Sequence, residues 1–214
     1  MIFPNRIEAG KLLAERLVNL KKPDVVVAIP KGGVAVAEPI THLFACPLTV
    51  HCVSKIRWSE DQRVGIGAIE ESGMVVRNTD FMAVHDVKEV SFDQALELAL
   101  DQSNYLASTL APWSKIVMDP DSFIIVVDDS LATGYSALMA VKFLQQAGYK
   151  HMIVAAPIAS RYAIETLEAS DIKVVVVHKS EEANFIADDH YNDFKEPNDD
   201  EVKAILTASL IRKE

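Results

Sequence analysis

Two neighbouring acidic residues, Asp128 and Asp129, follow an apolar run in the stretch IIVVDDSLATGYS at residues 124–136. The apolar run is typical of a strand buried in a parallel sheet, and a helical pattern begins after the loop of small residues. Such a loop presents backbone N–H groups and the positive end of a helix dipole, which together suit a phosphate. Thr133 and Ser136 add hydroxyl groups. The stretch therefore predicts a phosphate-binding loop.

The two aspartates would repel a phosphate bound beside them, so the predicted ligand has two chemically different parts. Carboxylates accept hydrogen bonds from vicinal hydroxyl groups and can hold water on a magnesium ion. A ribose 5-phosphate has both a phosphate and vicinal hydroxyls. The same residues also fit a simpler interpretation, in which an acid caps the next helix and the loop is only a tight turn. The preceding Val126-Val127 run and the following Ser136 favour the ligand site.

A second strand end carries the tetrapeptide PKGG at residues 30–33, directly after a β-branched run at residues 24–29. Ligands of open α/β sheets bind beyond the carboxyl ends of the strands. Because this tetrapeptide has no obvious packing purpose, Lys31 is interpreted as a ligand group. Residues 55–64 are polar and are expected to form a mobile loop, whose cations also fit ordinary solvated charges. Arg6 is interpreted as a surface charge. Tyr191 and Phe194 fit either the lining of a base pocket or packing in the core, and core packing is favoured.

Hydrophobic spacing predicts the elements that position these residues. A hairpin is expected around residues 71–73, and strands and helices alternate through the rest of the chain. The alternation predicts an α/β fold with a mostly parallel, doubly wound sheet flanked by helices, in one domain over residues 1–214. Helices are expected at residues 5–20, 34–44, 91–110, 135–147, 161–169 and 201–212, and strands at 24–29, 48–54, 123–127, 152–156 and 173–177.

The composition excludes several classes of protein. The chain has 214 residues, half of them hydrophobic, and a net charge of −10, which argues against binding to nucleic acid. No apolar run is long enough for a membrane span, and the first residues do not resemble a signal peptide. Cys46 and Cys52 are too few for a disulfide framework, and the six histidines show no metal-binding spacing. A cytoplasmic location is expected.

The stretch FIIVVDDSLATGYS resembles the signature with which type I phosphoribosyltransferases bind phosphoribosyl diphosphate (PRPP). That signature has four hydrophobic residues, two acids, three loop residues, Thr-Gly, any residue, and Thr or Ser. The resemblance implies Mg²⁺ as a cofactor that is bound through PRPP with no direct protein ligand, a water bridge to the two acids being one option. It also implies that the ribose and phosphate of PRPP contact Asp128, Asp129, Ser130, Leu131, Ala132, Thr133, Gly134, Tyr135 and Ser136.

The resemblance extends to other segments and covers most of the chain. The family has a short loop after its first strand that binds pyrophosphate and often contains a cis peptide, which here implies Lys31, Gly32 and Gly33. Residues 55–64 would be the flexible catalytic loop, with Lys55 and Arg57 as catalytic residues and Arg63 as a further cation. Segments at residues 5–14, 29–37, 66–73 and 191–194 resemble a subgroup of uncharacterised phosphoribosyltransferase-like proteins.

Three departures from these relatives bear on the substrate. The subgroup usually has Gly at the position of Ser130 and Thr at that of Ser136, and it carries a basic cluster where this chain has residues 98–105. The 6-oxopurine enzymes have an acidic general base where Ala132 stands, which disfavours hypoxanthine or guanine as the acceptor. Adenine, orotate and substrates other than nucleobases remain open.

The resemblance implies a phosphoribosyltransferase that binds PRPP and Mg²⁺, transfers the phosphoribosyl group to a nitrogen acceptor such as a nucleobase, and releases pyrophosphate. A homodimer is expected, with a small hood from residues 65–115, residues 180–214 or both. One alternative is a regulator that senses PRPP or a nucleotide without turnover. Such regulators usually carry a DNA-binding module, for which an acidic chain of 214 residues is expected to leave no room. A phosphatase with Asp128 as nucleophile is disfavoured because Ser130 stands where a second carboxylate would be needed.

Overall fold

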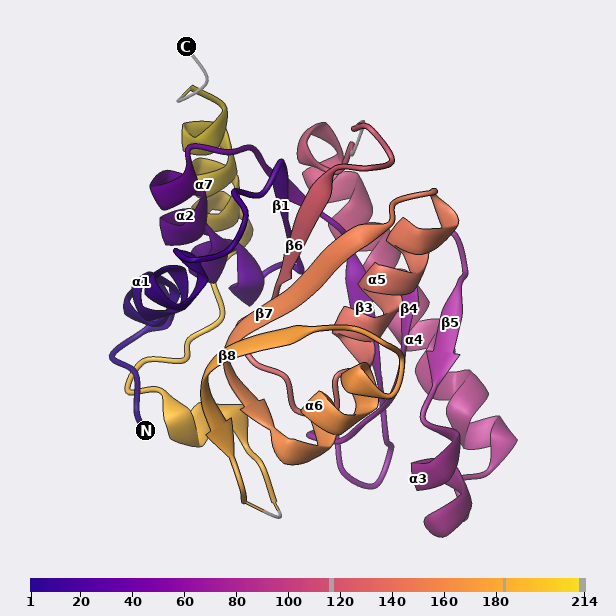
Figure 1. Ribbon diagram of the computed structural model, residues 1–214. Coiled ribbons are helices and arrows are strands. Elements are labelled where there is room, and N and C mark those ends of the chain that lie inside the picture. Colours follow the sequence, from indigo (N-terminus) through magenta and orange to yellow (C-terminus); the bar gives the residue numbers. More distant parts are fainter. Residues whose placement is uncertain (116–117, 183, 212–214) are drawn as a thin grey trace.

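A five-stranded parallel sheet forms the centre of the computed structural model, which describes residues 1–115, 118–182 and 184–211 (Figure 1). The strand order is β2-β1-β6-β7-β8, and every neighbouring pair is parallel. Val26 lies opposite Leu48 on one side and Ile125 on the other, which places the first long apolar run inside the sheet. The strands are β1 (Val25–Ala28), β2 (Leu48–Val50), β6 (Phe123–Val127), β7 (His151–Ser160) and β8 (Val174–Ser180).

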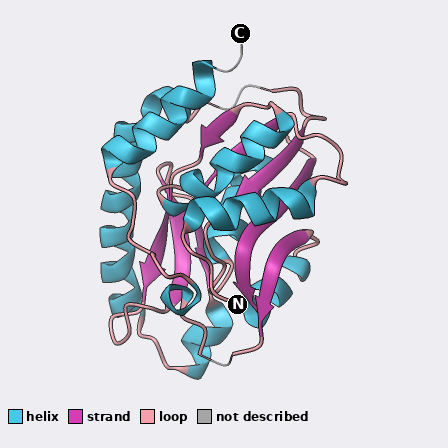
Figure 2. Ribbon diagram, turned by 90° about the vertical axis from the view of Figure 1, so that its left-hand side faces the viewer, coloured by secondary structure: helices cyan, strands magenta, loops and turns pink. Residues whose placement is uncertain are grey.

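Helices cover both faces of this sheet, as the alternating pattern predicts (Figure 2). One face packs against α1 (Arg6–Leu17), α2 (Gly32–Phe44) and α7 (Asp199–Ile211), with Leu13, Ile40 and Leu206 in its core. The opposite face packs against α5 (Tyr135–Gln146) and α6 (Arg161–Glu168), with Leu144 and Leu167 fully buried. The doubly wound fold is therefore confirmed.

A second, antiparallel sheet lies beside the first and has the order β3-β4-β5. It consists of β3 (Val53–Arg57), β4 (Gly65–Glu70) and β5 (Val75–Arg77), and α3 (Thr79–Val84) and α4 (Glu89–Leu110) follow it along the chain. Ile56 packs with Phe92 of α4, whereas Val53 packs in the core that contains α5. Because side chains alternate along a strand, Ser54 shares the α4 side with Ile56, and Lys55 shares the other side with Val53.

The first residues of the chain pair with the segment that follows β8, next to the large sheet. Short 3₁₀ helices are present at η1 (Ala111–Trp113) and η2 (Ala187–His190). The Phe3 N–H donates to the carbonyl of His190, and Phe3 and Tyr191 form an isolated parallel bridge. In the residues that the structure describes, no helix combines the length and the apolar character that crossing a bilayer requires.

The structure corrects several predicted elements. The single strand expected at residues 48–54 is divided between two strands, because the chain leaves the parallel sheet at His51-Cys52 and β3 then pairs with β4. Lys55 and Arg57 consequently lie on a strand, and the predicted mobile loop is shortened to residues 58–64. The hairpin around residues 71–73 is confirmed. α3 was not predicted, and several elements extend further than expected: α2 begins at residue 32, α4 begins at residue 89, β7 continues to residue 160, and β8 continues to residue 180.

Candidate functional site

A cleft with a volume of about 780 Å³ opens beyond the carboxyl ends of β1 and β6. The large sheet contributes the loops that carry Lys31 and the Asp128-Asp129 pair. The small sheet contributes residues of β3, and one face of α4 forms the opposite wall. Residues 185–188 and Phe194 close the side near the C-terminal segment. Both strand-end motifs found in the sequence therefore open on one cleft.

The acidic pair directly follows the last residue of β6, and both side chains are buried. The Asp129 N–H donates to Oδ1 of Asp128 at 2.9 Å. Burial, followed by the charge of Asp129, raises the pKa of Asp128 to about 7, and the ammonium of Lys55 opposes that rise. Asp128 therefore depends on nearby positive charge to be ionised at neutral pH.

Arg6, at the start of α1, is bonded to the second acid and is not the surface charge that the sequence analysis expected. Its Nε donates to Oδ2 of Asp129 at 2.7 Å, and one Nη donates to the carbonyl of Lys195 at 2.8 Å. The guanidinium also lies 3.9 Å from the centroid of the Phe194 ring. Arg6 is 7% exposed, so this ion pair is largely shielded from water. These contacts link Asp129 to the C-terminal segment.

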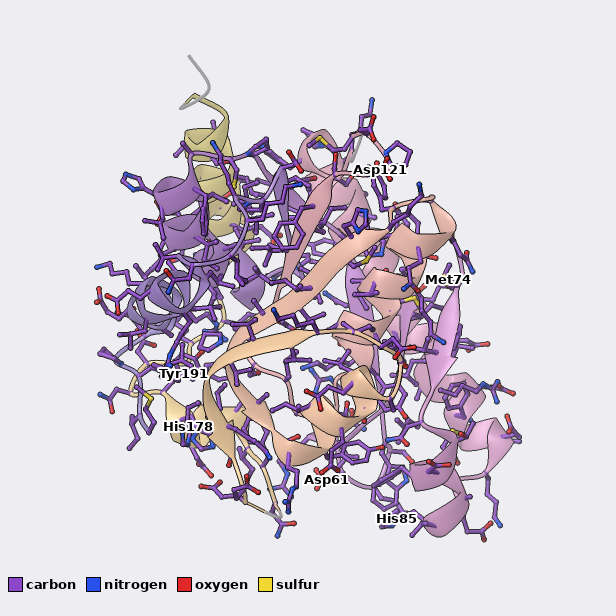
Figure 3. The ribbon with its side chains drawn as sticks, viewed as in Figure 1. Asp61, Met74, His85, Asp121, His178 and Tyr191 are labelled. Carbon is purple, nitrogen blue, oxygen red and sulfur yellow. The ribbon has the colours of Figure 1, made fainter. Side chains whose placement is uncertain are left out.

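Tyr191 forms a hydrogen bond with the backbone of Asp129. Its hydroxyl donates to the backbone carbonyl of Asp129 at 2.7 Å. Burial raises the pKa of the Tyr191 phenol, so its hydroxyl stays protonated and remains a donor. The side chain packs with Phe3, Ala9 and Ile158, next to α1 and β7, as expected for a core residue (Figure 3). Phe194 stacks on Tyr191 against the same core cluster and also lines the cleft.

The loop after β1 brings Lys31 to the cleft. The peptide bond between Pro30 and Lys31 is cis, as the resemblance implied. The Lys31 ammonium lies 3.1 Å from Oδ1 of Asp199, at the first turn of α7, and the Tyr105 hydroxyl donates to the other oxygen of that carboxylate. Sequence analysis did not identify Asp199 or Tyr105 as neighbours of this loop.

The two glycines after Lys31 have different surroundings. A Cβ on Gly32 would lie 1.9 Å from Oδ2 of Asp129, so only glycine fits between the loop and the acidic pair. The Gly33 N–H donates to the carbonyl of Ile29, in the first turn of α2. Gly32 therefore lies in the cleft wall, whereas the backbone donor of Gly33 is already used.

The three cations of residues 55–63 line the rim of the cleft in different ways. Lys55 lines the cleft from β3, and its positive charge opposes the rise in the pKa of Asp128. One Nη of Arg57 donates to the carbonyl of Gln62 at 2.8 Å. Arg63 donates to both carboxylate oxygens of Asp61, at 2.9 and 2.7 Å. Lys55 is therefore the cation of this group whose charge acts on the acidic pair.

The loop after the acids reaches the cleft at some positions and not at others. Ser130, Ala132 and Ser136 line it, and the buried Ser136 hydroxyl has no hydrogen-bond partner among the described residues. Gly134 has φ +79° and is the N-cap of α5, a conformation that favours glycine. The remaining expected residues lie outside the described cleft wall: Leu131, Thr133, Gly134 and Tyr135. Leu131 is buried, and its N–H donates to the carbonyl of Ile158.

The residues present fit a magnesium ion that the ligand carries. Within the described ranges, no group of three or more His, Cys, Asp or Glu side chains is arranged to hold a metal. Asp128 and Asp129 both line the cleft, but Arg6 already binds one oxygen of Asp129. Oxygen donors of this kind suit Mg²⁺, which keeps several waters and binds through few carboxylates. Asp128 is the carboxylate best placed to accept hydrogen bonds from such waters.

Comparison with known proteins identifies relatives over nearly the whole described fold. A family model described as "Phosphoribosyl transferase domain" matches residues 3–194. Two Mycobacterium tuberculosis proteins, "Putative phosphoribosyl transferase MT0597" and "Putative phosphoribosyl transferase Rv0571c", are each 28% identical over 206 residues. The match covers 96% of this chain and 46% of each relative, so the chain spans about half the length of these curated relatives.

Solved structures show the same likeness. The crystal structure of TT1426 from Thermus thermophilus is 30% identical and superposes with a TM-score of 0.73, over 97% of this chain and 99% of that chain. The AQ2163 protein from Aquifex aeolicus is 11% identical with a TM-score of 0.50, over 84% of this chain and 74% of that one, and is alike in fold alone. The family match ends at residue 194, so it does not include Lys195 or Asp199.

Proposed function

The chain belongs to the phosphoribosyltransferase family, and on that premise we propose that it binds PRPP with Mg²⁺, transfers the phosphoribosyl group to a nitrogen acceptor and releases pyrophosphate. One observation carries the proposal: the acidic pair, the Lys31 loop and the unpartnered hydroxyl of Ser136, within the part of the chain that the structure describes, all line one cleft. The carboxylate pair suits sugar hydroxyl groups and the turn beside it suits a phosphate, so the two together favour a sugar phosphate as the ligand.

The ribose, the 5-phosphate and the diphosphate of PRPP each have complementary groups in the cleft. Asp128 and Asp129 accept hydrogen bonds from the ribose hydroxyls, and Arg6 keeps Asp129 oriented for that contact. The Ser136 hydroxyl and the first turn of α5 bind the 5-phosphate. Lys31 binds the diphosphate beside Gly32, which leaves space because it has no side chain.

Transfer of a phosphoribosyl group requires little covalent chemistry from the protein. The bond from C1 to the diphosphate breaks as the acceptor nitrogen approaches, so positive charge develops on the ribose and negative charge on the leaving group. Positioning of the two reactants and stabilisation of those charges supply the rate. Mg²⁺, when bound, offsets charge on the diphosphate. Lys55 and Arg57 stabilise the leaving group from the β3 side, and the small sheet with α4 acts as the hood that limits access of water.

A sensor of PRPP that lacks turnover is the second candidate. It is favoured by the fact that several cations of the cleft already have partners, as in Arg6–Asp129, Lys31–Asp199 and Arg63–Asp61. Such a sensor would bind PRPP through the same acidic pair and would release no pyrophosphate with any acceptor. Binding and turnover must therefore be measured separately.

Calorimetric titration of PRPP with Mg²⁺ tests the proposal. The wild type should bind, and Asp128→Asn/Asp129→Asn should weaken binding by roughly 100-fold or more, since both carboxylates that accept the ribose hydroxyls are lost. The matched control is Asp93→Asn/Glu97→Gln, which removes two exposed acids of α4. No binding by the wild type, or equal loss in both double variants, would contradict the assignment.

Turnover is then tested by release of pyrophosphate with a panel of nitrogen acceptors. Lys55→Ala or Arg57→Ala should lower turnover while PRPP still binds, because these cations act on the leaving group. Unchanged turnover in both variants removes them from the mechanism. Binding of PRPP without release of pyrophosphate for any acceptor would favour the sensor.

A further inference from the structure

The cleft extends beyond the residues assigned to PRPP, toward α4, the α4 side of β3 and residues 185–188. This second part is where an acceptor must enter to reach the C1 position of the ribose, because the loops of the large sheet hold the sugar phosphate. An inference about this wall therefore rests on the proposed function. Its chemistry restricts the class of acceptor.

One stripe of α4 forms most of this wall, and the stripe carries no charge. Its residues recur at spacings of three and four, which places them on one helical face. The four acids of the same helix are absent from the cleft wall, and α4 contains no Lys or Arg; these acids are Glu89, Asp93, Glu97 and Asp101. The described residues of the stripe are Ser91, Gln94, Ala95, Leu98, Ala99, Gln102 and Leu106.

A buried hydroxyl faces the stripe from β3. Ser54 is 5% exposed and lines the cleft, and its Oγ has no hydrogen-bond partner among the residues that the structure describes. A buried polar group without a partner costs roughly 1–3 kcal/mol, which a ligand that bonds to it can recover. Gln94 and Gln102 are exposed at the cleft and offer both a donor and an acceptor in each amide.

No cation of the described wall is available for an anionic acceptor. Lys31, Lys55 and Arg57 face the diphosphate in the proposed reaction, Arg6 binds Asp129, and Arg63 binds Asp61. Residues 185–188 contribute Phe185 and Ile186 together with an acid, Asp188. An acceptor with a carboxylate would meet uncharged amides, apolar side chains and a negative charge.

We propose that the wall formed by Ser54, Gln94 and Gln102 is the acceptor subsite, and that it selects an uncharged nitrogen heterocycle with an amide-type edge over one that bears a carboxylate. The glutamine amides complement a C=O and N–H pair, and the apolar side chains of Leu98 and Leu106 cover the ring. Selection arises because a site built for hydrogen bonds leaves polar groups unpaired when the wrong ligand enters.

Two matched pairs of probes test this proposal: uracil against its 6-carboxylate, and nicotinamide against nicotinate. Each is titrated by calorimetry into protein saturated with ribose 5-phosphate and magnesium pyrophosphate. In at least one pair, the uncharged probe should bind at least roughly 10-fold more tightly than the probe that bears the carboxylate. Equal or tighter binding of both carboxylates, or no binding of either uncharged probe, would overturn the proposal.

Variants of the wall give a second readout. Gln102→Leu and Ser54→Ala should each weaken the uncharged probe about five-fold or more without changing the affinity for ribose 5-phosphate, and Gln102→Arg should shift the preference toward the carboxylate. Gln145→Leu, on exposed α5 surface, is the matched control. Unchanged probe affinity in Gln102→Leu and Gln102→Arg would also overturn the proposal. If PRPP itself fails to bind, the proposed function fails; if PRPP binds and these results do not follow, only the acceptor assignment fails.

Discussion

Removal of the Arg6 side-chain charge tests how the acidic pair is stabilised. Arg6 Nε lies 2.7 Å from Asp129 Oδ2, and both residues are less than a tenth exposed. Loss of one partner from a buried ion pair leaves the other charge without compensation and costs about 3–5 kcal/mol. Arg6→Met keeps much of the length and apolar packing of the side chain. We expect it to lower the free energy of unfolding by about 3 kcal/mol, a large part of the roughly 5–15 kcal/mol typical of a domain.

Lys11→Met is the matched control because Lys11 belongs to the same helix and also forms an ion pair, with its Nζ 2.6 Å from Oε1 of Glu8. That pair is exposed, with side-chain exposures of 57% and 45%. Exposed pairs of this kind contribute only about 0–1 kcal/mol. Urea unfolding followed by tryptophan fluorescence measures both variants. The reasoning is refuted if Arg6→Met costs no more than Lys11→Met.

A double-mutant cycle separates the ion pair from the packing of Arg6 on Phe194. Arg6→Met/Asp129→Asn leaves neither charge unpaired, so its cost should be smaller than the sum of the two single variants. The stacking of the guanidinium on Phe194, at 3.9 Å, is lost in both variants that lack Arg6 and cancels in the cycle. Strictly additive costs would show that the contact contributes no coupling energy.

Three further perturbations test other parts of the cleft. Because burial and the neighbouring acid raise the pKa of Asp128 to about 7, the folded state retains a proton that the unfolded chain loses near pH ~4. Stability should therefore fall as pH rises from about 4 to 7, and Asp128→Asn should reduce that slope in urea unfolding; identical slopes would contradict this. Asp199→Asn frees Lys31 from a carboxylate 3.1 Å away and should tighten binding of inorganic pyrophosphate roughly five-fold by calorimetry, whereas weaker binding would show that the acid positions the lysine. Gly32→Ala places a Cβ 1.9 Å from a carboxylate oxygen and should cost about 2 kcal/mol or more in thermal unfolding. That cost should exceed the cost of Gly73→Ala, where nothing lies within 4 Å and only the φ of +91° opposes a side chain; a smaller cost would mean that the loop moves freely.

The sequence was sufficient to predict the large sheet because its central strands are continuous apolar runs buried on both faces. It was insufficient at residues 48–57, where LTVHCVSKIR contains no glycine or proline to mark a break. The chain passes from the parallel to the antiparallel sheet at His51-Cys52 because β3 pairs with β4, and that pairing depends on residues further along the chain. This switch also places Lys55 on a strand rather than in a loop.

The site was predictable where its residues belong to a local motif at a strand end, and unpredictable where distant side chains form ion pairs with those motifs. Asp128, Asp129 and Ser136 follow from one local motif, and all three line the cleft. Arg6 lies 123 residues from Asp129, and no periodic pattern links them. Lys31 and Asp199 are likewise brought together only by the packing of α2 against α7. Long-range ion pairs of this kind depend on tertiary structure, which single-sequence patterns do not encode.

The charge of the cleft bears on how an acidic protein would hold the proposed polyanionic ligand. The chain has a net charge of −10, yet the described part of the cleft wall contains five cationic and four acidic residues. Most of those cations bind carboxylates, so a diphosphate bound at Lys31 as proposed would take the place of Asp199 instead of meeting a free charge. Such an exchange contributes less net affinity than a new ion pair, because the displaced carboxylate loses its partner. It follows that binding should depend strongly on Mg²⁺, which offsets ligand charge before the cations of the cleft have to be released.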